Sequence, residues 1–276
     1  MPAGMGALFA TFVYSAPFVR AGDVETLRGH GRDVLQNIKP LPPGVGEITY
    51  WEIKLGPVDV IGYAVISIEA VQQSDRLVYR YRNEMKLRFE NNARIQASID
   101  ATLRPTFEPI EIAMERISIT PDGEERKGLN RARVGDDEVA LLAMLGGEEQ
   151  SSKAPRPPSP FVFAIETLAQ RIDVSSLPDF TLAEFDPQRG TAGDLKFASH
   201  ELPDGTRTLF TIRAVDEQPS YQFWYDASGR LERWGEASRP ALVVRTTKEG
   251  VDRVKESLRA AEEQWNRETN PPKRGE

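Results

Sequence analysis

The segment that decides the fold is RLVYRYRNEMKLRFE, residues 76–90. One set of alternate residues is aromatic or aliphatic, broken only by Asn83, and it comprises Tyr79, Tyr81, Met85, Leu87 and Phe89. The set between them is charged and comprises Arg80, Arg82, Glu84, Lys86 and Arg88. Because side chains alternate between the two faces of a strand, the segment is predicted to be one long strand with a buried face and a solvated face.

The flanking segments repeat this pattern and predict an antiparallel run of strands. Further strands are predicted at residues 46–55, 58–71, 93–103 and 106–119. Asn91-Asn92 can turn the chain between two of them, because asparagine tolerates positive φ. Pro109 suits a bulge or an edge, because proline has no N–H to donate. The middle of 58–71 is apolar on both faces, so another element is expected to cover it.

The middle of the chain has weaker signals. A short helix is predicted at 136–147, where Asp136 can cap the first turn and a glycine pair can end the last. Proline and serine residues in 148–160 indicate a linker or an exposed loop. A second helix is predicted at 161–173, entered through a serine and a proline.

Strands resume at residue 194 and continue to 246, with turns at 203–205 and 226–229. In the hairpin that contains the second turn, one face is predicted to carry Tyr221, Phe223 and Tyr225. A C-terminal amphipathic helix is predicted at about 247–266. Its apolar stripe comprises Val251, Val254, Leu258, Ala261 and Trp265.

The N-terminal segment is uncharged from Met1 to Val19, and small or β-branched residues precede Gly22 in Val19-Arg20-Ala21, which fits a cleavage site after Ala21. It is either a signal peptide or a first strand; a stable membrane span is not predicted, because Pro17 and Arg20 interrupt it. The predicted organisation is therefore 1–21 as signal peptide or first strand, 22–147 as a β-meander half with a short helix, 148–160 as linker or loop, 161–266 as a second β half with flanking helices, and 267–276 as a disordered tail. The two halves form either one domain or two.

Composition excludes several kinds of chemistry. A net charge of −7 over 276 residues argues against a nucleic-acid binder, which needs a basic surface. The absence of cysteine removes disulfides, thiol nucleophiles and thiolate metal sites. Two histidines, His30 in a predicted loop and His200 in a predicted strand, are too few for a histidine-based zinc site. No serine-hydrolase elbow or phosphate-binding loop is present, so no catalytic residue, cofactor or metal is predicted.

Paired carboxylates are the remaining enzymatic option, as in a carbohydrate-active hydrolase. The candidates on neighbouring predicted strands are Glu84, Asp100, Glu108, Glu111 and Glu115. Alternation places Glu84 and Asp100 on polar faces, where charges are expected without any catalytic role.

The long strands are predicted to twist and curl into a half-barrel, with a helix across its mouth and an apolar hollow inside. The candidate ligand-binding residues that would line this hollow are Tyr50, Tyr63, Tyr79, Tyr81, Phe89, Phe210, Phe223 and Tyr225. The alternative is that these aromatic side chains simply fill a core.

Several short motifs resemble a family of uncharacterised bacterial cell-envelope domains. They are the Gly46-Glu47 start of a strand, the small residues Gly62 and Ala64, the Ile99-Asp100 pair and Pro105-Thr106-Phe107. The resemblance covers residues 46–117 and, more loosely, 194–246. It implies an exported protein with a curved antiparallel sheet of the lipoprotein-carrier type, and it brings no catalytic residues.

These observations predict a mainly β, non-enzymatic envelope protein, periplasmic or secreted. Its expected partner is an apolar or lipid-like molecule bound on the concave face, or an envelope protein. The alternatives are a structural or partner-binding accessory domain without a small ligand, and the two-carboxylate hydrolase. The sequence does not predict the oligomeric state.

Overall fold

The computed structural model describes residues 21–56, 59–158, 160–237 and 240–269. In this part of the chain one sheet of fifteen strands dominates, and its strand order is β8-β7-β6-β5-β4-β3-β2-β1-β15-β14-β13-β12-β11-β10-β9. The strands of the first half are β1 (Gly46–Leu55), β2 (Asp59–Gln73), β3 (Arg76–Arg88), β4 (Arg94–Leu103), β5 (Pro109–Ile119), β6 (Glu125–Val134), β7 (Glu138–Leu145) and β8 (Glu148–Pro155). Those of the second half are β9 (Phe161–Val162), β10 (Phe180–Asp186), β11 (Thr191–Glu201), β12 (Arg207–Arg213), β13 (Pro219–Tyr225), β14 (Leu231–Glu236) and β15 (Ala241–Thr246).

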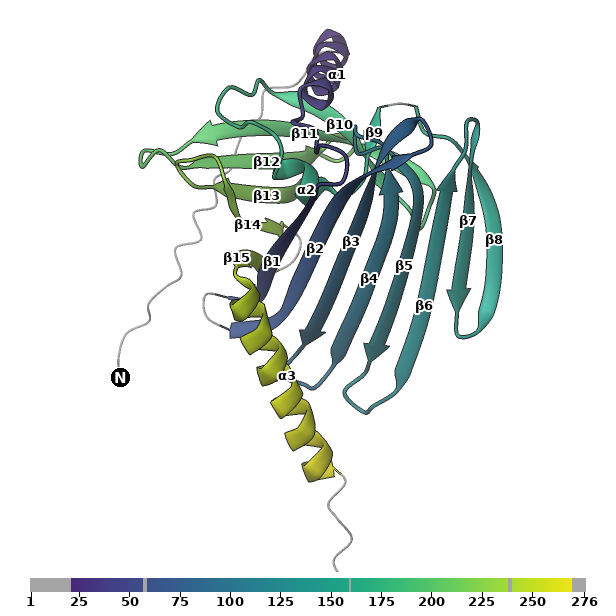
Figure 1. Cartoon of the computed structure of the whole chain (residues 1–276), viewed down its shortest axis with the longest axis vertical. Coiled ribbons are helices and arrows are strands. Elements are labelled where there is room, and N and C mark those ends of the chain that lie inside the picture. The colour runs from purple at the N-terminus through teal and green to yellow at the C-terminus, as the bar shows by residue number, and fades with distance from the viewer. Residues whose placement is uncertain (1–20, 57–58, 159, 238–239, 270–276) are drawn as a thin grey trace, which may run out of the picture.

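The sheet is a curled, unclosed meander, as the alternation of the long strands predicted (Figure 1). Each pair of neighbours is antiparallel except β9 and β10, which are parallel. The two β halves belong to one hydrogen-bonded sheet, because β1 pairs with β15 from Tyr50–Thr246 to Leu55–Ala241. Hairpins of a few residues join most strands, so the chain order and the spatial order coincide within each half.

The five strands predicted in the first half are confirmed. Pro109 lies at a bulge, where the register of β4 and β5 shifts between Thr102 and Leu103. The predicted Tyr221–Tyr225 strand is β13, and it forms a hairpin with β14.

Two predictions about the middle of the chain are wrong. Residues 138–145 form the strand β7, not a helix, and β7 pairs with β6 and β8. The run Val139, Leu141, Ala143 alternates and so faces one side of the sheet, while Gly146 and Gly147 adopt positive φ in the hairpin turn rather than ending a helix. Most of the predicted linker is also a strand, since Glu148–Pro155 is β8.

A helix that was not predicted from the sequence precedes the sheet. This helix, α1 (Ala21–Gln36), packs against β10, and Val34 and Leu35 enter the core. Gly31 allows this approach, because a Cβ there would lie 2.1 Å from the carbonyl oxygen of Thr181. His30 therefore lies in a helix and not in a loop. The predicted signal peptide or first strand falls on residues outside the described part, apart from Ala21.

The C-terminal helix α3 (Lys248–Thr269) is confirmed, but it does not cross the mouth of the half-barrel. It lies on the outer face against β1 and β2 (Figure 1). Val251, Val254 and Leu258 are buried there, which covers the outer face of β2 as the two-sided apolar pattern predicted. Glu262 fastens the helix to β3 and β4 by ion pairs with Lys86 and Arg94. No helix formed by the described residues is long and apolar enough to cross a bilayer.

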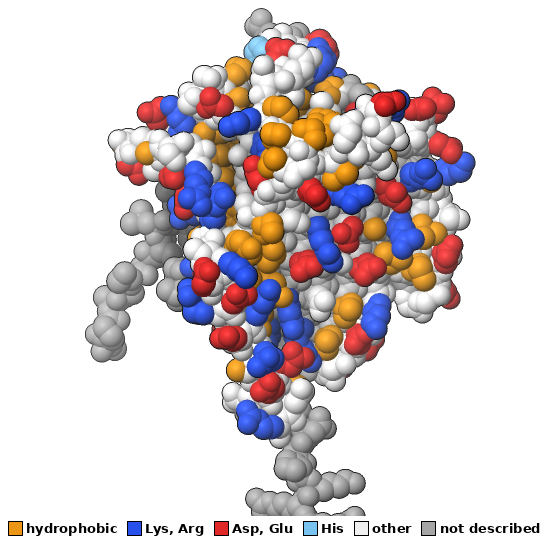
Figure 2. Space-filling view, viewed as in Figure 1, with side chains coloured by type: hydrophobic (Ala, Val, Ile, Leu, Met, Phe, Trp, Pro, Cys, Tyr) orange, Lys and Arg blue, Asp and Glu red, His pale blue; other side chains and the backbone are white. Residues whose placement is uncertain are grey.

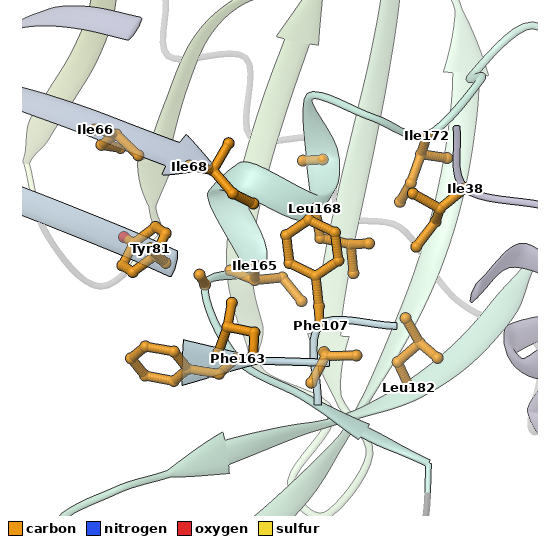
Figure 3. Close-up of a cluster of buried hydrophobic side chains, with 14 of the residues drawn as sticks. Ile38, Ile66, Ile68, Tyr81, Phe107, Phe163, Ile165, Leu168, Ile172 and Leu182 are labelled. Atoms are coloured by element: carbon orange, nitrogen blue, oxygen red, sulfur yellow. The ribbon is translucent and has the colours of Figure 1, made fainter. Parts of the chain in front are cut away.

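The core lies on the inner face, between the two halves of the curled sheet. A short helix, α2 (Ile165–Ala169), enters this space and is all that forms of the helix predicted at 161–173. Figure 3 shows Ile165 and Leu168 lying between side chains from β2 and β3 on one side and Leu182 of β10 on the other. Most of the segment that carries α2, residues 161–174, is buried, so the chain fills part of its own half-barrel. We call residues 161–174 the plug.

Candidate functional site

The inner face of the sheet divides into two ends along the strands. At the first, which we call the plugged end, the inward side chains are almost completely buried under the plug: Tyr79, Tyr81, Ala101, Leu103 and Ile112. At the second, which we call the open end, the apolar inward side chains are half-buried, and Arg116 is exposed beside Ala97; the apolar ones include Met85, Leu87, Phe89, Ile95, Ile99 and Met114. Asn83 of β3 lies between the two ends, opposite Ile66 and Ile99.

Aromatic contacts hold the plugged end together. The Tyr79 ring meets Phe107 edge-on at 5.8 Å between centroids, and the Tyr79 hydroxyl accepts a hydrogen bond from the backbone N–H of Leu41 at 3.1 Å. The Tyr81 ring meets Phe163 of the plug edge-on at 6.1 Å. These rings act as core, which was the alternative considered for them.

A hydrogen bond to a half-buried carboxyl group links the plug to β3. Glu166 of α2 accepts a hydrogen bond from the Tyr81 hydroxyl at 2.5 Å; Tyr81 is buried and Glu166 is half-buried. Burial raises the pKa of Glu166, because the charged carboxylate has lost its water. Burial and the neighbouring Glu166 both raise the pKa of Tyr81 well above its usual range, so its hydroxyl stays a donor. On the opposite wall the Tyr225 hydroxyl donates to the carbonyl of Ala169 at 3.0 Å.

A second, half-buried acid lies in the same interior. Glu184 of β10 accepts a hydrogen bond from the Tyr221 hydroxyl at 3.0 Å. Burial raises the pKa of Glu184 to about 7, although the hydrogen bond from Tyr221 lowers it. The charges that raise it further are all carboxylates, those of Glu166, Glu236 and Asp186. The interior beside α2 is therefore a region of negative potential when these acids ionise.

Some buried polar atoms near this region have no hydrogen-bond partner. They include Asn83 Oδ1, Thr167 Oγ1 and the indole nitrogen of Trp234. Hydrogen bonding from the side chains of Asn83 and Thr167 lowers the pKa of Tyr81, so both groups lie near its hydroxyl as donors. Buried polar atoms in folded proteins nearly always have a hydrogen-bond partner, so these three atoms are exceptions.

The predicted lining residues do not share one surface. Five lie on the inner face: Tyr79, Tyr81, Phe89, Phe223 and Tyr225. The register places Tyr50, Tyr63 and Phe210 on the outer face. Tyr63 lies beneath Lys255 of α3, and Phe210 contacts the ring of His200. Of the inner five, Phe89 alone is only half-buried, so it is the one at the open end.

The predicted carboxylate candidates lie on or near the outer face. Glu84 and Asp100 both pair with Arg82, at 3.1 and 3.6 Å, and Glu108 pairs with Arg156 at 2.5 Å. Glu111 and Glu115 are exposed on β5. Figure 2 shows acidic and basic side chains interspersed on this face. Such an arrangement is typical of a solvated sheet surface, as the alternation predicted.

The two histidines lie in regular secondary structure, His30 in α1 and His200 in β11. His30 Nδ1 lies 3.0 Å from the carbonyl oxygen of Asp179, and His200 lies on β11 as predicted. Among the described residues there is no cluster of histidine and acidic side chains that could hold a metal ion.

Neither half-buried acid was predicted from the sequence. Glu184 lies in FTLAEFD (180–186), where it is flanked by apolar residues on each side, and a charge in such a run is a signal that could have found it. Glu166 offers no such signal, because a glutamate in a short helical pattern is ordinarily exposed. Its burial depends on where the plug lies.

No family model matches the chain, and no curated protein matches it. Among solved structures, the chain is similar to a β-barrel-like protein of domain of unknown function DUF1849 from Brucella abortus. The two share 9% identity at a TM-score of 0.47, over 75% of this chain and 98% of that one. That neighbour is itself a bacterial β-sheet protein of unknown function. The lipoprotein-carrier likeness and the envelope location predicted above stay predictions.

Proposed function

We propose that this protein is a non-enzymatic, exported cell-envelope protein that binds an apolar, lipid-like ligand on the open end of the inner face. The observation that carries the proposal is the row of half-buried apolar side chains along β3, which comprises Met85, Leu87 and Phe89. Neighbouring strands extend it with Ile95, Ile99 and Met114.

A ligand bound at the open end would bury apolar side chains that are now partly exposed. Apolar area that a ligand removes from water contributes about 25 cal/mol per Å². The plugged end gains nothing further in this way, because Tyr79 and Leu103 are already at 0% exposure. A ligand chain lying along β3 would contact the curled sheet along its length and the plug at one end. It would therefore touch protein on more than one side.

Mass spectrometry of the gently purified native protein tests the proposal. We expect a bound lipid-sized mass that is lost on activation. Leu87→Asp should abolish this adduct, because it places a charge in the apolar row, and Ile117→Asp is the matched control. Ile117 is a half-buried apolar residue on the outer face of β5, so its variant should keep the adduct. Equal adducts in both variants would contradict binding at the open end.

The exported location is supported by the sequence alone, through the uncharged segment 1–19 and the small or β-branched residues, Val19 and Ala21, that precede Gly22. N-terminal sequencing of the protein from its own host tests it. Cleavage after Ala21 is expected, and an intact Met1 would argue against export by a cleaved signal.

A partner-binding role is the second candidate, favoured by β8. This strand is an edge of the sheet, and nearly all its side chains are exposed. Exposed edges can pair with a strand of another protein. A native mass without ligand, together with a co-purifying protein, would favour this role over the first.

A further inference from the structure

Arg116 is a cation on the inner face of the open end. It belongs to β5, where it alternates with Met114, and it lies between Ala97 of β4 and Gly128 of β6. These two neighbours are small, so they leave the length of the arginine side chain uncovered, and Arg116 is exposed. Within the described part of the chain, no acidic side chain forms an ion pair with Arg116.

The acidic side chains of the surrounding strands do not balance this charge, because they face the other way. The register of β3 to β6 places every acidic residue that these strands contain on the outer face: Glu84, Asp100, Glu111, Glu115 and Glu125. Arg126 also faces inward on β6, but it pairs with Glu124 in the turn before that strand. Arg116 therefore gives the open end a positive charge that these strands leave uncompensated.

The charge lies beside the apolar row. Met85 of β3 is opposite Ala97 of β4, and Ala97 is opposite Arg116, so Arg116 is two strands away from Met85, or about 10 Å. Ile95 and Ile99 flank Ala97 on the same face, and both are half-buried. One surface thus combines a partly exposed apolar area with an uncompensated cation at its side.

From this arrangement we infer that the ligand is a single-chain amphiphile with a carboxylate head, which pairs with Arg116 while its chain covers the apolar row. Charge complementarity decides the sign of the head, because Arg116 would repel a cation. A guanidinium can also donate two parallel hydrogen bonds to one carboxylate. A phosphate monoester carries about 1.5 to 2 negative charges, so part of its charge would lie without a partner beside apolar side chains. This inference rests on the proposed function and names the head group of its ligand.

Three probes with the same twelve-carbon chain test the head group, by titration calorimetry below their critical micelle concentrations. They are dodecanoate, dodecyl phosphate and dodecyltrimethylammonium. Dodecanoate should bind about fivefold more tightly than dodecyltrimethylammonium, because an exposed arginine attracts the first head and repels the second only modestly. Dodecyl phosphate should bind less tightly than dodecanoate. The preference for dodecanoate over dodecyltrimethylammonium should shrink at high salt, because counter-ions screen an exposed charge.

Charge reversal locates the head. Arg116→Glu should reverse the order, so that dodecyltrimethylammonium binds more tightly than dodecanoate. The matched control is Arg131→Glu, which changes the net charge by the same amount and should keep the wild-type order. Arg131 is also exposed and without an ion pair among the described residues, but it faces outward on β6, opposite Ala113. Thermal melting of each variant shows whether it is folded.

The outcomes separate the head group from the proposed function. Equal affinity for dodecanoate and dodecyltrimethylammonium would overturn the carboxylate head and leave apolar binding standing. A preference for dodecanoate that survives Arg116→Glu would also overturn it, because the head would then lie elsewhere. Tighter binding of dodecyl phosphate than of dodecanoate would replace the carboxylate by a phosphate. Binding of none of the probes would count against the proposed function itself.

Discussion

The plugged end and the open end of the inner face are built from the same strands, yet they differ in what covers them. On β3 the alternating pattern runs without a change of type from Tyr79 to Phe89, apart from Asn83. Tyr79 and Tyr81 are nevertheless buried, Tyr79 against Phe107 and Tyr81 against the plug, whereas Leu87 and Phe89 are half-buried. An alternating pattern shows that a face is apolar, but it does not show whether the protein or a ligand covers it.

The largest expected effect is on the free energy of unfolding. It is tested by replacing one leucine at the plugged end and one leucine at the open end. Leu103→Ala at the plugged end should lower the free energy of unfolding by about 2–5 kcal/mol, because Leu103 is fully buried and its loss leaves a cavity. Leu87→Ala at the open end should lower it by clearly less, since Leu87 is half-buried and solvent can fill the space. Urea denaturation of both variants measures the difference. Similar losses would mean that the open end is as well packed as the plugged end.

The next effect concerns pH and the acid beside the plug. The pKa of Glu184 is raised to about 7 in the folded protein, from 4.5, so the folded state holds its proton more tightly than the unfolded state does. The resulting stability is fully present below pH 4.5 and is lost as the pH rises through 7, by about 3 kcal/mol in all. Glu184→Gln keeps an acceptor for Tyr221 and should remove this loss.

Urea denaturation across pH 4–8 measures the slope for the wild type and for Glu184→Gln. The matched control is Glu84→Gln, on the outer face beside Arg82, which should leave the slope in place. An identical slope in the wild type and in Glu184→Gln would show that Glu184 is not the group that titrates.

The smallest expected change in the free energy of unfolding concerns the hydrogen bond between Tyr81 of β3 and Glu166 of the plug. Tyr81→Phe removes the donor to Glu166 and leaves a buried carboxyl oxygen without a partner, which should cost about 1–3 kcal/mol. The double variant Tyr81→Phe with Glu166→Leu should recover most of this loss, because both polar partners are then gone. Urea denaturation of the single and double variants gives the coupling energy between them. A loss that stays the same in the double variant would mean that the Tyr81 hydroxyl contributes to stability through a group other than Glu166.

Much of the sheet could be predicted because a strand with one apolar face is recognisable locally. The strands at 46–55 and 76–88, the bulge at Pro109 and the C-terminal helix all follow from periodicity or from the chemistry of a single residue. The strands β7 and β8 were missed because a glycine pair and several prolines suggested a helix end and a linker. Their strand conformation is stabilised by pairing with β6, which is a contact between segments.

The candidate site was less predictable for the same reason. Tyr81 was identified from alternation, but its partner Glu166 lies 85 residues away in the chain. Glu184 and Tyr221 are 37 residues apart and meet only across the curled second half. The pKa shifts of these acids arise from burial, which depends on every element that excludes water from them.

The sequence by itself determined that this protein is mainly β, that β3 has one apolar and one charged face, and that thiol chemistry is impossible. These properties depend on residue type and on the two-residue period of a strand. Only the tertiary structure decided that α3 lies on the outer face, that the plug fills one end of the half-barrel, and that two half-buried glutamates have raised pKa values. Those outcomes depend on which surfaces pack together, and close packing between distant segments leaves no mark on local periodicity.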